Sequence, residues 1–295
     1  LPICAHPLGL RNFMTVSVVT LNKNRRPHLL RLLEGLARGP APDECIVIEM
    51  GQDEGKLPDL PFPIRREALH RDGLPLAAAR NAGRKAASGD ILLYLDVDCI
   101  PGANLVPVLA GQVAQHDALI CFPIRYLPAG AVQDGWREDE LRRAGQLHTI
   151  RHFPEEGVAP ESNTGLFWTL GFGVRATTFD RIGGFDESFT GYGAEDTDFA
   201  FRARDRGVPL LFCGGTAAYH QHHGGFDPPL QHFEDIVANA RRFRAAHGFW
   251  PMDGWLDAFA RMGLIAADRS RDVTILRHPT AEEMEAARLP IERVF

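Results

Sequence analysis

Cysteine is scarce in this sequence and shows neither metal-binding nor redox spacing. The 295 residues contain five cysteines, and no two of them form a Cys-x-x-Cys pair. They are Cys4, Cys45, Cys99, Cys121 and Cys213. An odd number leaves one cysteine over in any scheme of disulfides. Because most of them stand inside apolar runs, where cysteine behaves as a small buried hydrophobe, we expect reduced thiols and a cytoplasmic setting.

Long hydrophobic runs and an excess of basic charge are also missing. The longest apolar runs have the length of a strand, far short of the ~20 residues that span a bilayer. Residues 1–10 lack a basic stretch followed by an apolar one, so no signal peptide is expected. Peripheral association with the inner face of a membrane stays open. With 38 acidic against 32 basic residues the formal net charge is −6, which argues against a nucleic-acid partner.

Strand-like and helix-like segments alternate over residues 12–125. β-Branched or apolar runs predict strands, and stretches with apolar residues at helical spacing predict helices. The expected order is strand 16–20, helix 27–36, strand 45–50, helix 74–87, strand 91–95 and strand 118–122. This order indicates an α/β protein with a mostly parallel, Rossmann-like sheet flanked by helices. Ligands of such sheets bind beyond the carboxyl ends of the strands.

The second half of the chain is less regular. We expect helices at 135–147 and 195–205, a mobile loop at 154–165, short strands at 210–213 and 217–220, and a helical extension that begins at residue 228. Acidic helix starts and glycine after helix ends support these boundaries. No internal repeat or low-complexity tract interrupts the pattern.

Two aspartates directly follow the strand at 91–95. In extended chain, residues i and i+2 point the same way, so Asp96 and Asp98 can face one ligand. A solvated strand end would explain a lone Asp-x-Asp equally well. At the carboxyl end of a buried strand, however, the pair is suited to a divalent cation that also binds phosphate oxygens.

A histidine further along offers another ligand for such a cation. His220 ends a predicted short strand, and His222 and His223 follow it. Imidazole suits Mn²⁺ better than Mg²⁺, which favours oxygen ligands. We therefore predict His220 as a metal ligand, ahead of His222 and His223, which are more simply explained as surface residues.

Three carboxylates begin the helix at 195–205. Acidic residues in a first turn complement the helix dipole, which accounts for Glu195 and Asp198. The glycines that precede them, from Gly183 to Gly193, instead suggest backbone held close to a ligand. We predict that Asp196, with Glu195 beside it, is catalytic and removes a proton from an attacking hydroxyl.

Taken together, these segments resemble inverting glycosyltransferases of family 2, which have the GT-A fold. The resemblance covers roughly residues 14–225. It is carried by residues 16–22, 76–83, 88–98 and 183–196, and by their order. Tyr219-His220-Gln221 after the acidic motif is similar to bacterial chondroitin-type polymerases and to galactosyl- and N-acetylgalactosaminyltransferases. In these enzymes a histidine joins the second aspartate on manganese, which implies Asp98 and His220 here.

The resemblance implies roles for further residues. It implies contacts with the base and ribose for Thr20, Asn22, Arg25 and Glu49. At the position of Glu49 the family more often has Asp. Arg80 would approach the diphosphate or base, Asp96 the ribose or metal, and Gly171 to Gly173 the donor sugar. The implied cofactor is Mn²⁺ or Mg²⁺. The implied donor is a UDP-sugar such as UDP-Gal, UDP-GalNAc or UDP-Glc, and the acceptor is a glycan or small molecule, as in polysaccharide biosynthesis.

The expected organisation is a catalytic domain over residues 12–225 and a C-terminal helical extension over 226–295. Residues 12–125 would bind the nucleotide, and residues 126–225 the donor sugar and acceptor. A retaining transferase of the same fold, or an inactive carbohydrate- or nucleotide-sugar-binding protein, stays as an alternative. Nucleotidyltransfer ranks low because residues 20–25 contain no glycine that could form a phosphate-binding loop.

Overall fold

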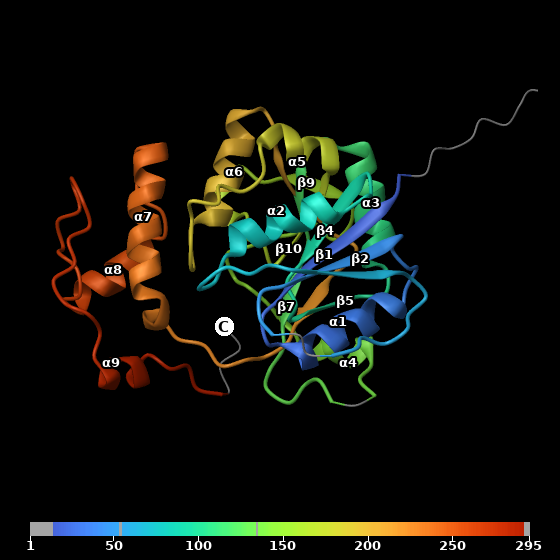
Figure 1. The fold of residues 1–295 in the computed structure, drawn as a ribbon, viewed down its shortest axis with the longest axis horizontal. Helices are drawn as coiled ribbons and strands as arrows, with labels where there is room; N and C mark the ends of the chain where they lie inside the picture. The colour runs from blue at the N-terminus through green and yellow to red at the C-terminus, as the bar shows by residue number, and fades with distance from the viewer. Residues whose placement is uncertain (1–13, 53–54, 134, 292–295) are drawn as a thin grey trace, which may run out of the picture.

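The computed structural model describes residues 14–52, 55–133 and 135–291 (Figure 1). The segment in which no signal peptide was expected, residues 1–10, lies outside them, as does Cys4. The other four cysteines are free and buried, in agreement with the expected reduced thiols. None of the described helices is long and apolar enough to cross a membrane.

An eight-stranded sheet forms the centre of the molecule, in the order β3-β2-β1-β4-β10-β6-β11-β9. The first four strands are mutually parallel, β10 runs antiparallel to both β4 and β6, and β11 is parallel to β6. Their bounds are β1 Val16–Asn22, β2 Glu44–Glu49, β3 Ile64–Ala68, β4 Ile91–Leu95, β10 Gly171–Arg175, β6 Leu119–Cys121, β11 Leu210–Cys213 and β9 Val158–Pro160. The expected α/β class with a mostly parallel sheet is confirmed.

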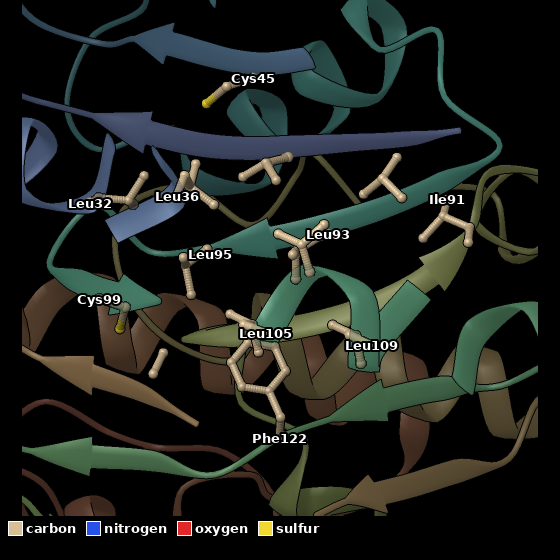
Figure 2. Packing of buried hydrophobic residues seen from close by; sticks show 14 of the residues in the cluster. Leu32, Leu36, Cys45, Ile91, Leu93, Leu95, Cys99, Leu105, Leu109 and Phe122 are labelled. Atoms are coloured by element: carbon tan, nitrogen blue, oxygen red, sulfur yellow. The ribbon is translucent and has the colours of Figure 1, made fainter. Parts of the chain in front are cut away.

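Helices cover both faces of this sheet because its strands are apolar on both sides. Leu93 and Leu95 of β4 join one cluster with α1 and α3, while Leu92 and Tyr94 join the other with α2, α5 and α6. The helices are α1 Arg26–Ala37, α3 Leu105–Gln115, α2 Leu76–Ala86, α5 Ala176–Ile182 and α6 Glu195–Asp205. Figure 2 shows the first cluster, with side chains of α1, β4 and α3 interdigitated.

A second, four-stranded sheet with the order β5-β12-β7-β8 follows the end of β4. Its strands are β5 Cys99–Pro101, β12 Ala218–His220, β7 Ile124–Tyr126 and β8 Gln146–Leu147. The helix expected at 135–147 is shorter than predicted and forms α4, Glu138–Ala144. Gly145 ends it in extended backbone, and Gln146 then pairs with Tyr126 of β7.

The segment 154–165 is more ordered than the expected loop. Val158–Pro160 forms the edge strand β9, antiparallel to β11, and Thr164–Leu166 forms a 3-10 turn. The amide of Gly214 donates to the carbonyl oxygen of Gly157 at 2.9 Å. The loop prediction is therefore wrong over β9, because cross-strand hydrogen bonds supply the order that a polar, proline-rich sequence did not suggest.

The C-terminal extension lies beside the sheet, next to α6 (Figure 1). It contains α7 Phe233–His247, α8 Asp253–Arg261 and α9 Ala281–Ala286. Apolar side chains such as Phe233, Ile236 and Phe259 form a separate cluster there. Tyr192, which precedes α6, packs against this cluster, so the extension reaches the segment that leads into α6.

Candidate active site

The carboxyl ends of β1 and β2 bring two predicted nucleotide contacts together. Asn22 and Glu49 are paired in register, and Asn22 Nδ2 donates to Glu49 Oε2 at 2.7 Å. Arg66 of β3 donates to the other oxygen of Glu49 at 2.9 Å. Thr20 is fully buried, and its hydroxyl has no hydrogen-bond partner in the described part of the chain. The roles of these residues towards a nucleotide stay predictions.

Strand pairing places His220 beside Asp98. β4 ends at Leu95, and β5, which begins at Cys99, pairs with β12 so that Cys99 stands opposite His220. His220 Nε2 lies 3.6 Å from Asp98 Oδ1. The backbone amide of Gln221 donates to the carbonyl oxygen of Asp98 at 2.7 Å, which holds the following residues against the same carboxylate.

Within the described residues, Asp98, His220 and His223 form the one group of possible metal ligands. One ligand atom from each residue lies within 4.8 Å of the others. His223 Nε2 is 3.3 Å from Asp98 Oδ2. Asp96, predicted to reach ribose or metal, stands outside this group, with Oδ1 4.0 Å from Arg80 Nη2.

The electrostatics of this group suit a cation. Burial lowers the pKa of His220 to about 4, so its imidazole is neutral near pH 7 and has a lone pair to donate. Burial alone would raise the pKa of the Asp98 carboxyl, but His220, His223 and Arg25 together hold that pKa well below its usual range. Arg25 pairs directly with Asp98 and so contacts this group; its contact with the base or ribose stays a prediction.

Arg80 lies between Asp96, which follows β4, and Glu195, which begins α6. It is 3% exposed, and its Nη1 lies 3.0 Å from Glu195 Oε1 while Nη2 donates to Thr169 Oγ1 at 2.6 Å. Breaking a buried pair of this kind costs about 3–5 kcal/mol because one charge is left uncompensated. In this structure Arg80 of α2 and Glu195 therefore position each other and fix α6 relative to α2.

Asp196 follows Glu195 at the start of α6 and is only partly buried. Its Oδ1 accepts the backbone amide of Thr197 at 2.7 Å. Burial, with the neighbouring charge of Glu195, raises the pKa of Asp196 to about 7, although Arg80 opposes the rise. A carboxylate with such a pKa can accept a proton near neutral pH, as a general base must.

The glycines assigned to the donor sugar also have a packing reason. A Cβ on Gly171 would stand 2.3 Å from the ring of Phe122, and one on Gly173 would stand 2.8 Å from Leu109 of α3. Both positions therefore need glycine for close packing of β10. Their contact with a sugar stays a prediction.

The sequence predicts His220 as a metal ligand ahead of both His222 and His223. The structure places His223 in the ligand group and leaves His222 outside it. The spacing between His220 and His223 is a weak signal in the sequence. Without the path of the backbone, it does not show whether His222 or His223 reaches Asp98. Gln221, whose Nε2 donates to the carbonyl oxygen of His28 on α1 at 3.2 Å, sets that path.

Comparison with known proteins identifies the family of this chain. The model of glycosyltransferase-like family 2 matches residues 66–243, more than half of the chain. Validoxylamine A glucosyltransferase of Streptomyces hygroscopicus subsp. limoneus is 30% identical over 223 residues, which cover 66% of this chain and 49% of that protein. Hyaluronan synthase of Pasteurella multocida is 26% identical over 211 residues, covering 61% and 21%. The chain thus spans about half the length of these relatives, or less.

Solved structures show the same fold. S. aureus TarS superimposes with a TM-score of 0.53 at 18% identity, covering 77% of this chain and 64% of that one. GalNAc-T7, solved with UDP, GalNAc and Mn²⁺, gives 0.55 at 17% identity, covering 86% and 58%. Both are similar in fold, which here means the GT-A arrangement of a mostly parallel sheet flanked by helices. The fold agrees with the family match, and that match shows that the chain belongs to glycosyltransferase-like family 2, a family of glycosyltransferases.

Proposed function

We propose that this chain transfers a sugar, with inversion, from a UDP-sugar to a hydroxyl of a glycan or small-molecule acceptor, and that it requires a divalent cation. The observation that carries the proposal is the group Asp98, His220 and His223 after the end of β4. Arg80, which lies 4.0 Å from Asp96 and is paired with Glu195, links this strand end to the start of α6, where Asp196 stands. Residues 12–225 would form the catalytic domain, divided near residue 125, and residues 226–295 the extension.

Asp98, His220 and His223 would hold the cation. One carboxylate and two imidazoles suit Mn²⁺ better than Mg²⁺. A bound cation would stabilise negative charge on the departing diphosphate. Arg25, which pairs with Asp98, adds positive charge at the same edge and would have to share that carboxylate with the metal.

Asp196 would take the proton of the acceptor hydroxyl. Its Oδ1 is held by the Thr197 amide, so Oδ2 is the oxygen that remains for the acceptor. Glu195 is paired with Arg80 and is unsuited to this role. A base on the acceptor side of the sugar supports a single displacement with inversion.

The donor class rests on relatives and structural neighbours. GalNAc-T7 was solved with UDP, GalNAc and Mn²⁺, and TarS was solved with UDP. The relatives include a glucosyltransferase and a mouse polypeptide N-acetylgalactosaminyltransferase. These likenesses favour UDP-Glc, UDP-Gal and UDP-GalNAc as the first donors to test.

A donor panel with Mn²⁺, scored by release of the nucleoside diphosphate, tests the proposal. We expect UDP release from one UDP-sugar, its loss on adding EDTA, and at least tenfold weaker Mn²⁺ binding in His223→Ala. NMR of the product would show the inverted anomeric configuration. Activity that persists unchanged in EDTA would remove the metal from the proposal, and UDP-sugar binding without consumption would favour a binding protein.

A further inference from the structure

The chain between α5 and α6 follows an unusual path before it reaches Asp196. Gly191, Gly193 and Ala194 all have positive φ, at 73°, 98° and 68°. A non-glycine residue in this region is strained, and such strain persists only where surrounding structure holds it. Ala194 is also the N-cap of α6 and has no side-chain capping bond. The start of α6 therefore depends on contacts from outside the helix.

Asn239 of α7 supplies one of these contacts. Its Nδ2 donates to the carbonyl oxygen of Thr190 at 2.9 Å and to that of Tyr192 at 3.3 Å. The residue is 1% exposed, so water does not compete for these bonds. One side-chain amide thus holds both carbonyls that flank Gly191.

The glycines on this path lie directly against the extension. A Cβ on Gly191 would stand 2.1 Å from the carboxyl carbon of Asp235, and one on Gly193 would stand 2.9 Å from Met252 Sδ. Gly191 and Gly193 therefore have a packing reason in α7 and the residue before α8, while the contact with a ligand that the sequence suggests stays a prediction.

His247, at the other end of α7, holds the first turn of α6. Its Nε2 lies 2.9 Å from Asp198 Oδ1, and both side chains are buried. A carboxylate only accepts hydrogen bonds, so Nε2 carries the proton. Arg202 donates to the other oxygen of Asp198 at 2.7 Å, so this carboxylate is held from two sides.

We propose that Asn239 and His247 are positioning residues through which the C-terminal extension holds Asp196 in place to face the acceptor. Their contacts lie on either side of Asp196. Asn239 binds Thr190, six residues before Asp196, and His247 binds Asp198, two residues after it. Both would act through their contacts with Thr190, Tyr192 and Asp198 and not on the substrate itself. This inference rests on the proposed function for its effect on turnover, while the ordering of residues 190–198 can be measured without turnover.

Two pairs of variants test the inference. Asn239→Asp keeps the shape but loses both N–H donors, and Asn104→Asp is its matched control. Asn104, at an exposed position, also donates to a backbone carbonyl, that of Gly215, which is outside residues 190–198. His247→Phe keeps the ring that packs on Phe243 but loses the donor, whereas His247→Gln retains a side-chain N–H.

Turnover and amide hydrogen exchange are the readouts. We expect kcat to fall at least tenfold in Asn239→Asp and His247→Phe and to stay within about threefold in His247→Gln and Asn104→Asp. Affinity for UDP with Mn²⁺ should change less than twofold throughout. Amides of residues 190–198 should exchange at least tenfold faster in the two impaired variants, with β1 and β2 unchanged.

The outcomes separate this inference from the proposed function. If exchange over residues 190–198 is unchanged in both impaired variants, Asn239 and His247 do not order this segment. If exchange is faster but kcat is normal, they order the segment without positioning Asp196. If the unaltered chain transfers no sugar from any donor, the proposed function fails, and with it the positioning of Asp196 for catalysis. The exchange rates would still show whether Asn239 and His247 order residues 190–198. If Asn239→Asp does not fold, the two His247 variants decide the question, because they address the same segment from the other side.

Discussion

Replacing Asp196 by Asn separates general-base catalysis from a structural role of this residue. Asn keeps the oxygen that accepts the Thr197 amide at 2.7 Å and places an amide NH₂ where Oδ2 was. The variant should therefore fold alike but lack a proton acceptor. A positioned base contributes about 10²–10⁴-fold to rate. At about 1.36 kcal/mol for each factor of ten, this corresponds to about 2.7–5.4 kcal/mol of the barrier.

The assay is UDP release with Mn²⁺ at saturating acceptor, together with calorimetry of UDP binding. We expect kcat of Asp196→Asn to fall by about 10²–10⁴-fold, with UDP affinity unchanged. Asp205→Asn is the control, because Asp205 ends the same helix and is exposed and paired with Arg204. If Asp196→Asn turned over within a few-fold of the parent, Asp196 would not be the base. Dipole complementarity alone would cost about 0.3–1 kcal/mol of stability and leave turnover normal.

The pKa of Asp196 also determines in which direction Asp196→Asn changes the free energy of unfolding. Burial raises the pKa of Asp196 to about 7 from 3.8, so the folded protein binds this proton more tightly than the unfolded chain. The stability that the proton confers is present below pH 3.8 and is lost as the pH rises through about 7. At pH 8 the carboxylate is therefore unfavourable, and the free energy of unfolding of Asp196→Asn should equal or exceed that of the parent.

Three further predictions concern the metal, the pH profile and the glycine path. His220→Ala should weaken Mn²⁺ binding at least tenfold by calorimetry, or about 1.4 kcal/mol; His222→Ala should do less, and the reverse ranking would reassign the ligand. kcat/KM should fall about tenfold per pH unit below about 7 as Asp196 is protonated, whereas a flat profile to pH 5 would contradict a base with that pKa. Gly191→Ala should lower the free energy of unfolding by about 1–3 kcal/mol, because φ is 73° and the new Cβ would meet Asp235. An unchanged midpoint in denaturant would refute this close approach.

Patterns within short stretches predicted much of the fold. Apolar, β-branched runs predicted β1, β2 and β4, because burial on both faces leaves a local signature. β3 was missed because Ile64–Ala68 is an edge strand of mostly polar residues whose order comes from pairing with β2. Asp96 and Asp98 were predicted at the sheet edge because their place follows directly from the strand before them.

By itself, the sequence determined the family, the α/β class and the residue types that can bind a metal or take a proton. Tertiary structure alone decided which of these residues meet. The pairing of β5 with β12 brings His220 to Asp98, and the path of Gln221 brings His223 rather than His222. The partner of Arg80 is Glu195, 115 positions away. Such meetings depend on strand register and helix packing between distant segments, which no local pattern encodes.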